Sequence, residues 1–230
     1  LSLSTVTGAL HPFMASLPAT LPAVTVEGRA LEGAGFHRDV VTRVSVDYKG
    51  AVLPAGCVVA ALELIPDTLY VDAFELGELA RFGHTRARMA ASEAEMELER
   101  PSFVSVPGVV LVDVAADAAG EAVLRMPIHA RYQAVSAVAD HRDAALPPPG
   151  FVIACDAPGG AQSLVRLGAA GGGLAAAMPL TIRQPVGRSG DETLVFFGTH
   201  VVTAVGALFL VAVAACAPPV PRVGAKGKTE

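Results

Sequence analysis

Residues 194–217 read LVFFGTHVVTAVGALFLVAVAACA, which is 24 consecutive positions without a Lys, Arg, Asp or Glu. As an α-helix this stretch is roughly 36 Å long at about 1.5 Å per residue, which exceeds the roughly 30 Å core of a bilayer. The alternative is the core helix of a soluble protein, but such helices are usually shorter. The stretch therefore predicts one transmembrane helix near the C-terminus.

Charged residues on either side of this stretch predict its orientation. Arg188, Asp191 and Glu192 precede it, whereas residues 218–230 carry only cations until Glu230. Short segments rich in Lys and Arg stay in the cytosol. We therefore expect a single-pass type I membrane protein, with the residues before the helix in the lumen or outside the cell.

The last five residues, KGKTE, contain two of the three lysines in the chain, Lys226 and Lys228. They resemble the K-x-K-x-x signal that is read in the cytosol and returns membrane proteins to the endoplasmic reticulum (ER). A plain cluster of cations after a membrane helix is the alternative. The tail predicts residence in the ER membrane and argues against a cell-surface receptor.

The composition and the motifs of the chain exclude several classes of function. The net charge is −5 and the pI about 5.7, so nucleic acid is not an expected partner. The six His residues lack zinc-ligand spacing, and neither a G-x-S-x-G elbow nor a phosphate-binding loop occurs. We expect no catalytic residue, no cofactor-binding residue and no metal site.

The region before the helix has the strand pattern of a mostly β domain. Short β-like runs separated by Gly and Pro favour an antiparallel β-sandwich over residues 26–190. Residues 1–25 are expected to be an extended or disordered lead-in, and because they lack a basic, apolar leader we expect a missing signal peptide. The expected strands are 40–48, 57–65, 109–114, 121–132, 152–155 and 180–186.

Other parts of this region are expected to be a helix, a hairpin and loops. Residues 74–82 form the expected helix, with Asp72 as its N-cap. Residues 109–114 and 121–132 are expected to pair as a hairpin with a longer loop. Residues 139–150 and 168–178 are expected to be loops.

Cys57 and Cys155 lie in β-like runs of this region, whereas Cys216 lies in the membrane helix. A disulfide between Cys57 and Cys155 is permitted in an oxidising lumen, and two separate buried thiols are the alternative.

Five short blocks occur in order before the helix: GFHRD (35–39), IPDTLYVDAFEL (65–76), ELERP (97–101), MPIHARY (126–132) and VIACD (152–156). With the single C-terminal helix, they make the chain similar to the PIG-X family, the accessory subunit of glycosylphosphatidylinositol (GPI) mannosyltransferase I. The resemblance implies a non-catalytic ER protein that binds and stabilises the multispanning catalytic subunit PIG-M. That partner transfers the first mannose from dolichol-phosphate-mannose to glucosaminyl-phosphatidylinositol in GPI-anchor biosynthesis.

Three other functions are the alternatives to this role. The chain could be a general ER-lumenal chaperone for membrane proteins, a type I receptor ectodomain or an enzyme in its own right.

Several residues of these blocks are candidates for a partner interface or for a network in the core. In a strand, His129 and Arg131 point to one face and Tyr132 to the other. Arg131 either pairs with a carboxylate of its own domain, from Asp39, Asp72 or Glu75, or faces the catalytic subunit. The candidates are His37, Arg38, Asp72, Glu75, His129, Arg131 and Tyr132.

The membrane helix has features that suit a partner helix. His200 either reaches the headgroups or hydrogen-bonds the partner. Small residues let another helix approach closely, and these are Gly198, Thr199, Thr203, Ala204 and Gly206.

Overall fold

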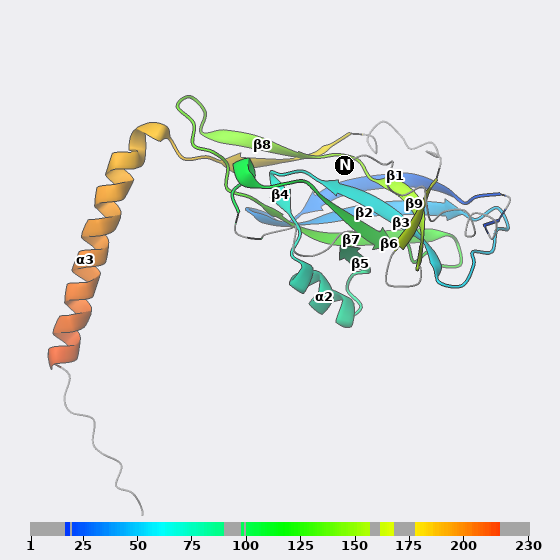
Figure 1. The fold of residues 1–230 in the computed structure, drawn as a ribbon, viewed down its shortest axis with the longest axis horizontal. Coiled ribbons are helices and arrows are strands. Elements are labelled where there is room, and N and C mark those ends of the chain that lie inside the picture. The colour runs from blue at the N-terminus through cyan, green and yellow to red at the C-terminus, as the bar shows by residue number, and fades with distance from the viewer. Residues whose placement is uncertain are drawn as a thin grey trace, which may run out of the picture.

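The computed structural model describes residues 17–18, 20–89, 98, 100–156, 162–167 and 178–216. A body of layered strands makes up most of it, and a long helix extends from one end of this body (Figure 1). The strands are β1 (Ala23–Glu32), β2 (His37–Asp47), β3 (Cys57–Ile65), β4 (Leu69–Tyr70), β5 (Ala87–Met89), β6 (Gly108–Asp113), β7 (Glu121–Ala130), β8 (His141–Leu146), β9 (Gly150–Asp156), β10 (Gln162–Arg166) and β11 (Leu180–Pro185). The helices are α2 (Ala73–Arg81), η3 (Ser102–Val104), η5 (Ser189–Asp191) and α3 (Glu192–Cys216).

The first sheet has the strand order β1-β2-β7-β4, and all its pairs are antiparallel. Its long central strands alternate between buried and more exposed residues over much of their length, as in a sheet that packs one face on a core. In β2, Val40, Val44 and Val46 are buried in the core, and β-branched side chains of this kind fit a pleated surface well. The β2–β7 ladder pairs His37 with His129 at one end and Ser45 with Glu121 at the other.

The second sheet has the order β10-β9-β3-β6-β5 and is also antiparallel. Val59, Ala61 and Ile65 of β3 lie in the same buried cluster as Val40 and Val44 of the first sheet. The two sheets therefore pack face to face around one core. A β-sandwich-like domain followed by a C-terminal apolar helix, the fold class expected from the sequence, is confirmed.

The connection between β6 and β7 is not the expected hairpin loop. β6 belongs to the second sheet and β7 to the first, so residues 114–120 carry the chain from one layer to the other. Gly120 enters the first sheet with φ of 85°, and a Cβ added there would lie 2.6 Å from the Val46 carbonyl oxygen. Only glycine fits this close approach.

The prediction of a loop over residues 139–150 is wrong. This segment contains β8, which pairs with β11 in a separate two-stranded sheet. β8 reads HRDAAL and buries only Ala144 and Leu146, so its strand character depends on β11. Proline follows at Pro147, where the chain leaves the ladder.

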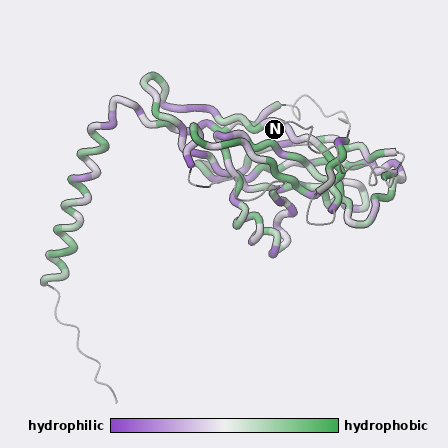
Figure 2. The backbone as a smooth tube through the Cα atoms, viewed as in Figure 1, coloured by the Kyte–Doolittle hydropathy of each residue, from purple (hydrophilic) through white to green (hydrophobic). Residues whose placement is uncertain are grey.

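The two long helices agree with expectation to within two residues at each end. The carboxylate of Asp72 accepts hydrogen bonds from the backbone N–H groups of Phe74 and Glu75, which confirms it as the N-cap of α2. α3 is apolar over most of its length (Figure 2), and none of its residues is buried. Within the described residues, Ser189–Cys216 is the one helix long and apolar enough to cross a membrane.

Candidate functional site

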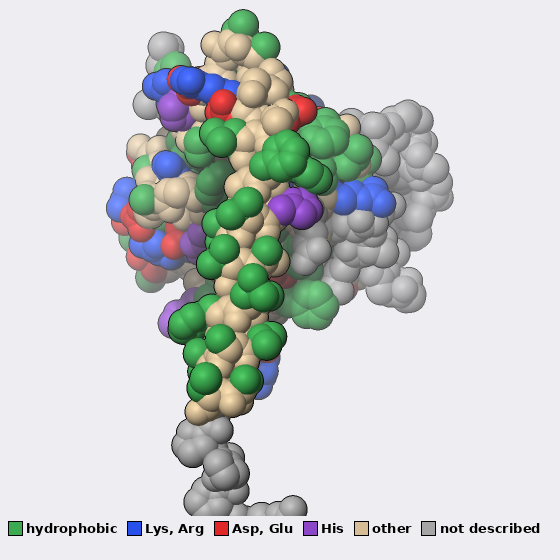
Figure 3. Space-filling view, turned by 90° about the vertical axis from the view of Figure 1, so that its left-hand side faces the viewer, with side chains coloured by type: hydrophobic (Ala, Val, Ile, Leu, Met, Phe, Trp, Pro, Cys, Tyr) green, Lys and Arg blue, Asp and Glu red, His purple; other side chains and the backbone are tan. Residues whose placement is uncertain are grey.

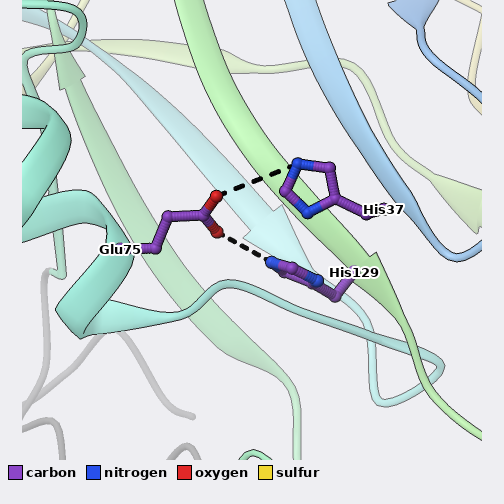
Figure 4. A group of neighbouring side chains, drawn as sticks. All are labelled: His37, Glu75 and His129. Atoms are coloured by element: carbon purple, nitrogen blue, oxygen red, sulfur yellow. Dashed lines mark hydrogen bonds and ion pairs between the residues drawn. The ribbon is translucent and has the colours of Figure 1, made fainter.

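Two histidines and a glutamate from three elements meet at one end of the sandwich (Figure 4). His37 begins β2, and His129 is its direct neighbour across the ladder on β7. Glu75 reaches them from the first turn of α2: His129 Nε2 donates to its Oε2 over 2.8 Å, and His37 Nε2 lies 3.8 Å from its Oε1. The three ligand-type atoms all lie within 4.8 Å of one another, close enough to share one metal ion. Spacing along the chain could not indicate this cluster, because the β2–β7 register and the fold of α2 create it.

Arg131 is buried, with 3% exposure, and it contacts this cluster through the ring of Tyr70. Its guanidinium lies over the ring of Tyr70, 4.8 Å from the ring centre, and the Tyr70 ring stacks on His129 at 4.8 Å. Arg131 Nη1 also donates to the backbone carbonyls of Leu98 and Arg100, over 3.2 and 2.8 Å. Burial raises the pKa of Tyr70. Arg131 therefore acts within its own domain, on carbonyl oxygens and an aromatic ring.

The other candidates from these blocks have separate surroundings. Arg38 donates to the Gly35 carbonyl over 3.2 Å, and Asp72 caps α2. Asp39 lies 4.0 Å from Arg125. The structure therefore brings together His37, Glu75 and His129. Arg131 does not contact them directly but lies over the Tyr70 ring, which stacks on His129.

Exposed apolar side chains surround this end of the sandwich, and we call them the anchor-proximal patch. Tyr132 is 77% exposed and packs against the ring of Phe36, with 5.6 Å between the ring centres. The η3 turn lies beside it, because the Ser102 N–H donates to the Tyr132 carbonyl over 2.9 Å. The patch consists of Phe36, Phe103, Val104, Tyr132 and Val135.

Hydrogen bonds fix the segment after Tyr132 to the start of the membrane helix. The Ser136 N–H donates to the Gly187 carbonyl over 2.9 Å, and the Ser189 N–H donates to the Ser136 carbonyl over 3.1 Å. Arg188 forms two bonds to Asp140, 2.6 and 3.0 Å long. This hydrogen-bonded ion pair lowers the pKa of Asp140. The patch is therefore held next to the point where the chain turns into α3.

Within the part of the chain that the structure describes, no residue of α3 is buried against the domain. Apolar side chains line the helix in Figure 3, and charged side chains gather near its upper end. The Nδ1 of His200 donates to the Phe196 carbonyl one turn earlier, over 2.7 Å, so half of its hydrogen-bonding capacity is met within the helix. Lys226 and Lys228 of the proposed retrieval signal lie outside the described residues.

Two further features bear on the stability of the domain. Cys57 and Cys155 are direct neighbours in the β3–β9 ladder, and their sulfurs are bonded in a disulfide. Arg29 and Glu63 form a buried ion pair that is not expected from the sequence. The sequence feature that could indicate this pair is a charged residue within an apolar strand. Glu63 lies on the same face of β3 as the buried Val59, Ala61 and Ile65.

Comparison with protein-family models assigns the chain to a family. Residues 33–167, more than half of the sequence, match the family model described as PIG-X / PBN1, and the chain belongs to this family. Comparison with curated proteins finds no match. The family implies an accessory role in GPI mannosyltransferase I, and it points to GPI-anchor biosynthesis and the ER. The matched residues include the whole His37–Glu75–His129 cluster.

Proposed function

We propose that this member of the PIG-X / PBN1 family is the non-catalytic, stabilising subunit of ER GPI mannosyltransferase I. In this role it binds the multispanning catalytic subunit PIG-M, which transfers the first mannose from dolichol-phosphate-mannose to glucosaminyl-phosphatidylinositol. The observation that carries the proposal is the position of the anchor-proximal patch, an exposed apolar surface fixed beside an exposed apolar helix.

Two binding surfaces follow from this position, one on the domain and one in the membrane. The patch offers aromatic and aliphatic side chains, the kind that dominates the centre of protein interfaces. The helix offers His200 and small residues, including Gly198 and Gly206. Because one chain carries both surfaces, binding at one raises the effective concentration at the other. A subunit that binds only the folded catalytic subunit protects it by mass action.

The proposal includes a type I orientation with the sandwich in the ER lumen. The cations after the helix favour a cytosolic tail, and Lys226 and Lys228 then lie where retrieval signals are read. A disulfide between Cys57 and Cys155 suits an oxidising lumen. Protease treatment of sealed ER vesicles tests the orientation, because only the tail should be cleaved.

Affinity purification in mild detergent, followed by mass spectrometry, tests the main proposal. The full chain should recover one multispanning mannosyltransferase, and Tyr132→Ser should recover several-fold less of it. Val52→Ser is the matched control, because Val52 is 85% exposed and lies beyond the Ser45–Glu121 end of the β2–β7 ladder. Recovery of many unrelated multispanning proteins would instead indicate a general chaperone. Mannosyl transfer by the purified chain alone would refute a non-catalytic role.

A further inference from the structure

We propose that His37, Glu75 and His129 bind a zinc ion that joins α2 to the first sheet. Two imidazoles and one carboxylate are a common set of three protein ligands for zinc, with a fourth position open to water or to another group. The carboxylate and imidazole atoms lie within 4.8 Å of one another in the structure (Figure 4). This inference stands apart from the proposed subunit role, because it depends only on the geometry of these three side chains.

The distances suit zinc after a small movement of one side chain. Bonds of about 2.0 Å in a tetrahedral site place ligand atoms roughly 3.3 Å apart. The observed separations from the two Glu75 oxygens are 2.8 Å to His129 and 3.8 Å to His37. The second of these is too long for a hydrogen bond, so His37 faces the carboxylate without bonding it. Its side chain is 55% exposed, which leaves its ring room to move.

The backbone holds the three ligands in place. His37 and His129 are register partners in an antiparallel ladder, so their side chains leave the sheet side by side. Glu75 lies in the first turn of α2, where its N–H donates to the Asp72 cap over 3.4 Å. The Tyr70 ring stacks on His129 and restrains its orientation. A site with ligands on two strands and a capped helix needs little reorganisation when the ion binds.

The chemistry of the ligands favours zinc over the other common divalent ions. Calcium and magnesium prefer sites built from oxygen ligands, whereas two of the three ligands here are imidazoles. The carboxylate of Glu75 supplies the negative charge that a cation at this position needs. The expected ion is therefore zinc, with cobalt as its spectroscopic substitute.

Metal analysis of the full chain in detergent, purified without a histidine tag, tests this inference. After equilibration with ZnCl₂ and removal of free ion, the wild-type chain should retain about one zinc per chain. Cobalt should give the intense visible absorption of a four- or five-coordinate site. Loss of a residue that only hydrogen-bonds a metal ligand usually weakens metal affinity by roughly 10- to 100-fold. His37→Gln and Glu75→Gln remove a ligand itself, so each should weaken zinc affinity by more than this.

His141→Gln is the matched control, since His141 is exposed and lies on β8, outside the cluster. It should bind zinc like the wild-type chain. Because His37 is exposed, His37→Gln should fold, and circular dichroism checks this before zinc is measured. Absence of retained zinc in the folded wild-type chain would overturn the inference. Equal zinc binding by His37→Gln, Glu75→Gln and the control would also overturn it, and would indicate adventitious binding elsewhere.

Discussion

Arg29 and Glu63 form a buried ion pair between the two sheets, with Arg29 Nη2 2.6 Å from Glu63 Oε2. Their side chains are 1% and 3% exposed, and Arg29 Nη1 also donates to the Pro147 carbonyl over 2.8 Å. Burial raises the pKa of Glu63 to about 7, because the loss of water around the carboxylate outweighs the attraction of Arg29. The pair therefore links β1, an edge strand of the first sheet, to β3, the middle strand of the second. The charge of the Glu63 carboxyl changes near neutral pH.

The raised pKa of Glu63 predicts a pH-dependent stability. The folded state binds this proton more tightly than the unfolded state, whose ordinary pKa is 4.5. The contribution of Glu63 to the free energy of unfolding is therefore largest below about pH 4.5, falls as the pH rises and levels off above about pH 7, by roughly 3 kcal/mol in all. In Glu63→Gln this dependence should vanish, so its stability should improve relative to wild type between pH 5 and pH 7. Urea unfolding followed by circular dichroism at several pH values measures the difference.

Glu78→Gln is the control for this experiment, because Glu78 is exposed on α2 and pairs with Arg81 on the same helix. Its stability should run parallel to that of the wild type across the same pH range. A constant difference between Glu63→Gln and wild type from pH 5 to pH 7 would contradict the prediction.

Substitution of Arg131 should affect folding rather than partner binding. Arg131→Ala leaves the carbonyls of Leu98 and Arg100 without its guanidinium and removes the contact with Tyr70. We expect a loss of about 2–3 kcal/mol in the free energy of unfolding, from hydrogen bonds to a charged group and a cation–π contact. Arg131→Lys should lose less, because it keeps the charge but not the planar fork. Urea unfolding gives both values.

Partner recovery separates this role from a direct interface. At a temperature where Arg131→Ala remains folded, it should still recover the catalytic subunit. A variant with wild-type stability that no longer recovers the partner would show that Arg131 faces the catalytic subunit instead.

The disulfide between Cys57 and Cys155 should be essential to the stability of the domain. It closes a loop with a sequence separation of 98 residues, and in the chain-entropy model such a cross-link contributes up to roughly 4–5 kcal/mol. Cys57→Ala/Cys155→Ala should lower the urea midpoint accordingly. Alkylation of the denatured wild-type chain without reductant, read by mass spectrometry, should modify Cys216 alone. Alkylation of all three cysteines would contradict the bond.

The elements that could be predicted from sequence are those whose own residues show a local pattern, such as an apolar run or a helix cap. β2 and β3 have long β-branched or apolar runs, and α2 has an Asp cap. β1 was not expected because a bulge between Val26 and Gly28 breaks its alternation, and β8 was not expected because its first three residues are polar. Such strands depend on their partners in the sheet, which a local pattern does not contain. The hairpin prediction for β6 and β7 failed for a similar reason, since a short connection does not indicate which layer the next strand joins.

The candidate site was predictable as a set of residues but not as a geometry. His37, Glu75 and His129 belong to sequence blocks that lie far apart in the chain, and only the β2–β7 register and the position of α2 bring them together. Arg131 donates to the backbone carbonyls of Leu98 and Arg100, and no sequence pattern marks such acceptors, because every residue has a carbonyl. The Arg29–Glu63 pair needs contact between two sheets, which is a property of the whole fold.

The small residues of α3 predict which face of the helix binds the partner. At about 3.6 residues per turn, Thr199, Thr203 and Gly206 lie along one face, and Ala215 lies on the opposite side. Gly206→Leu keeps the helix apolar but blocks the close approach of another helix, which contributes about 1 kcal/mol per contact in membranes. We therefore expect roughly 5-fold weaker recovery of the catalytic subunit in mild detergent. Ala215→Leu adds nearly the same bulk to the opposite face and should leave recovery unchanged. Equal losses for Gly206→Leu and Ala215→Leu would mean that the helix has no preferred face, and the patch on the domain would then carry the specificity of binding.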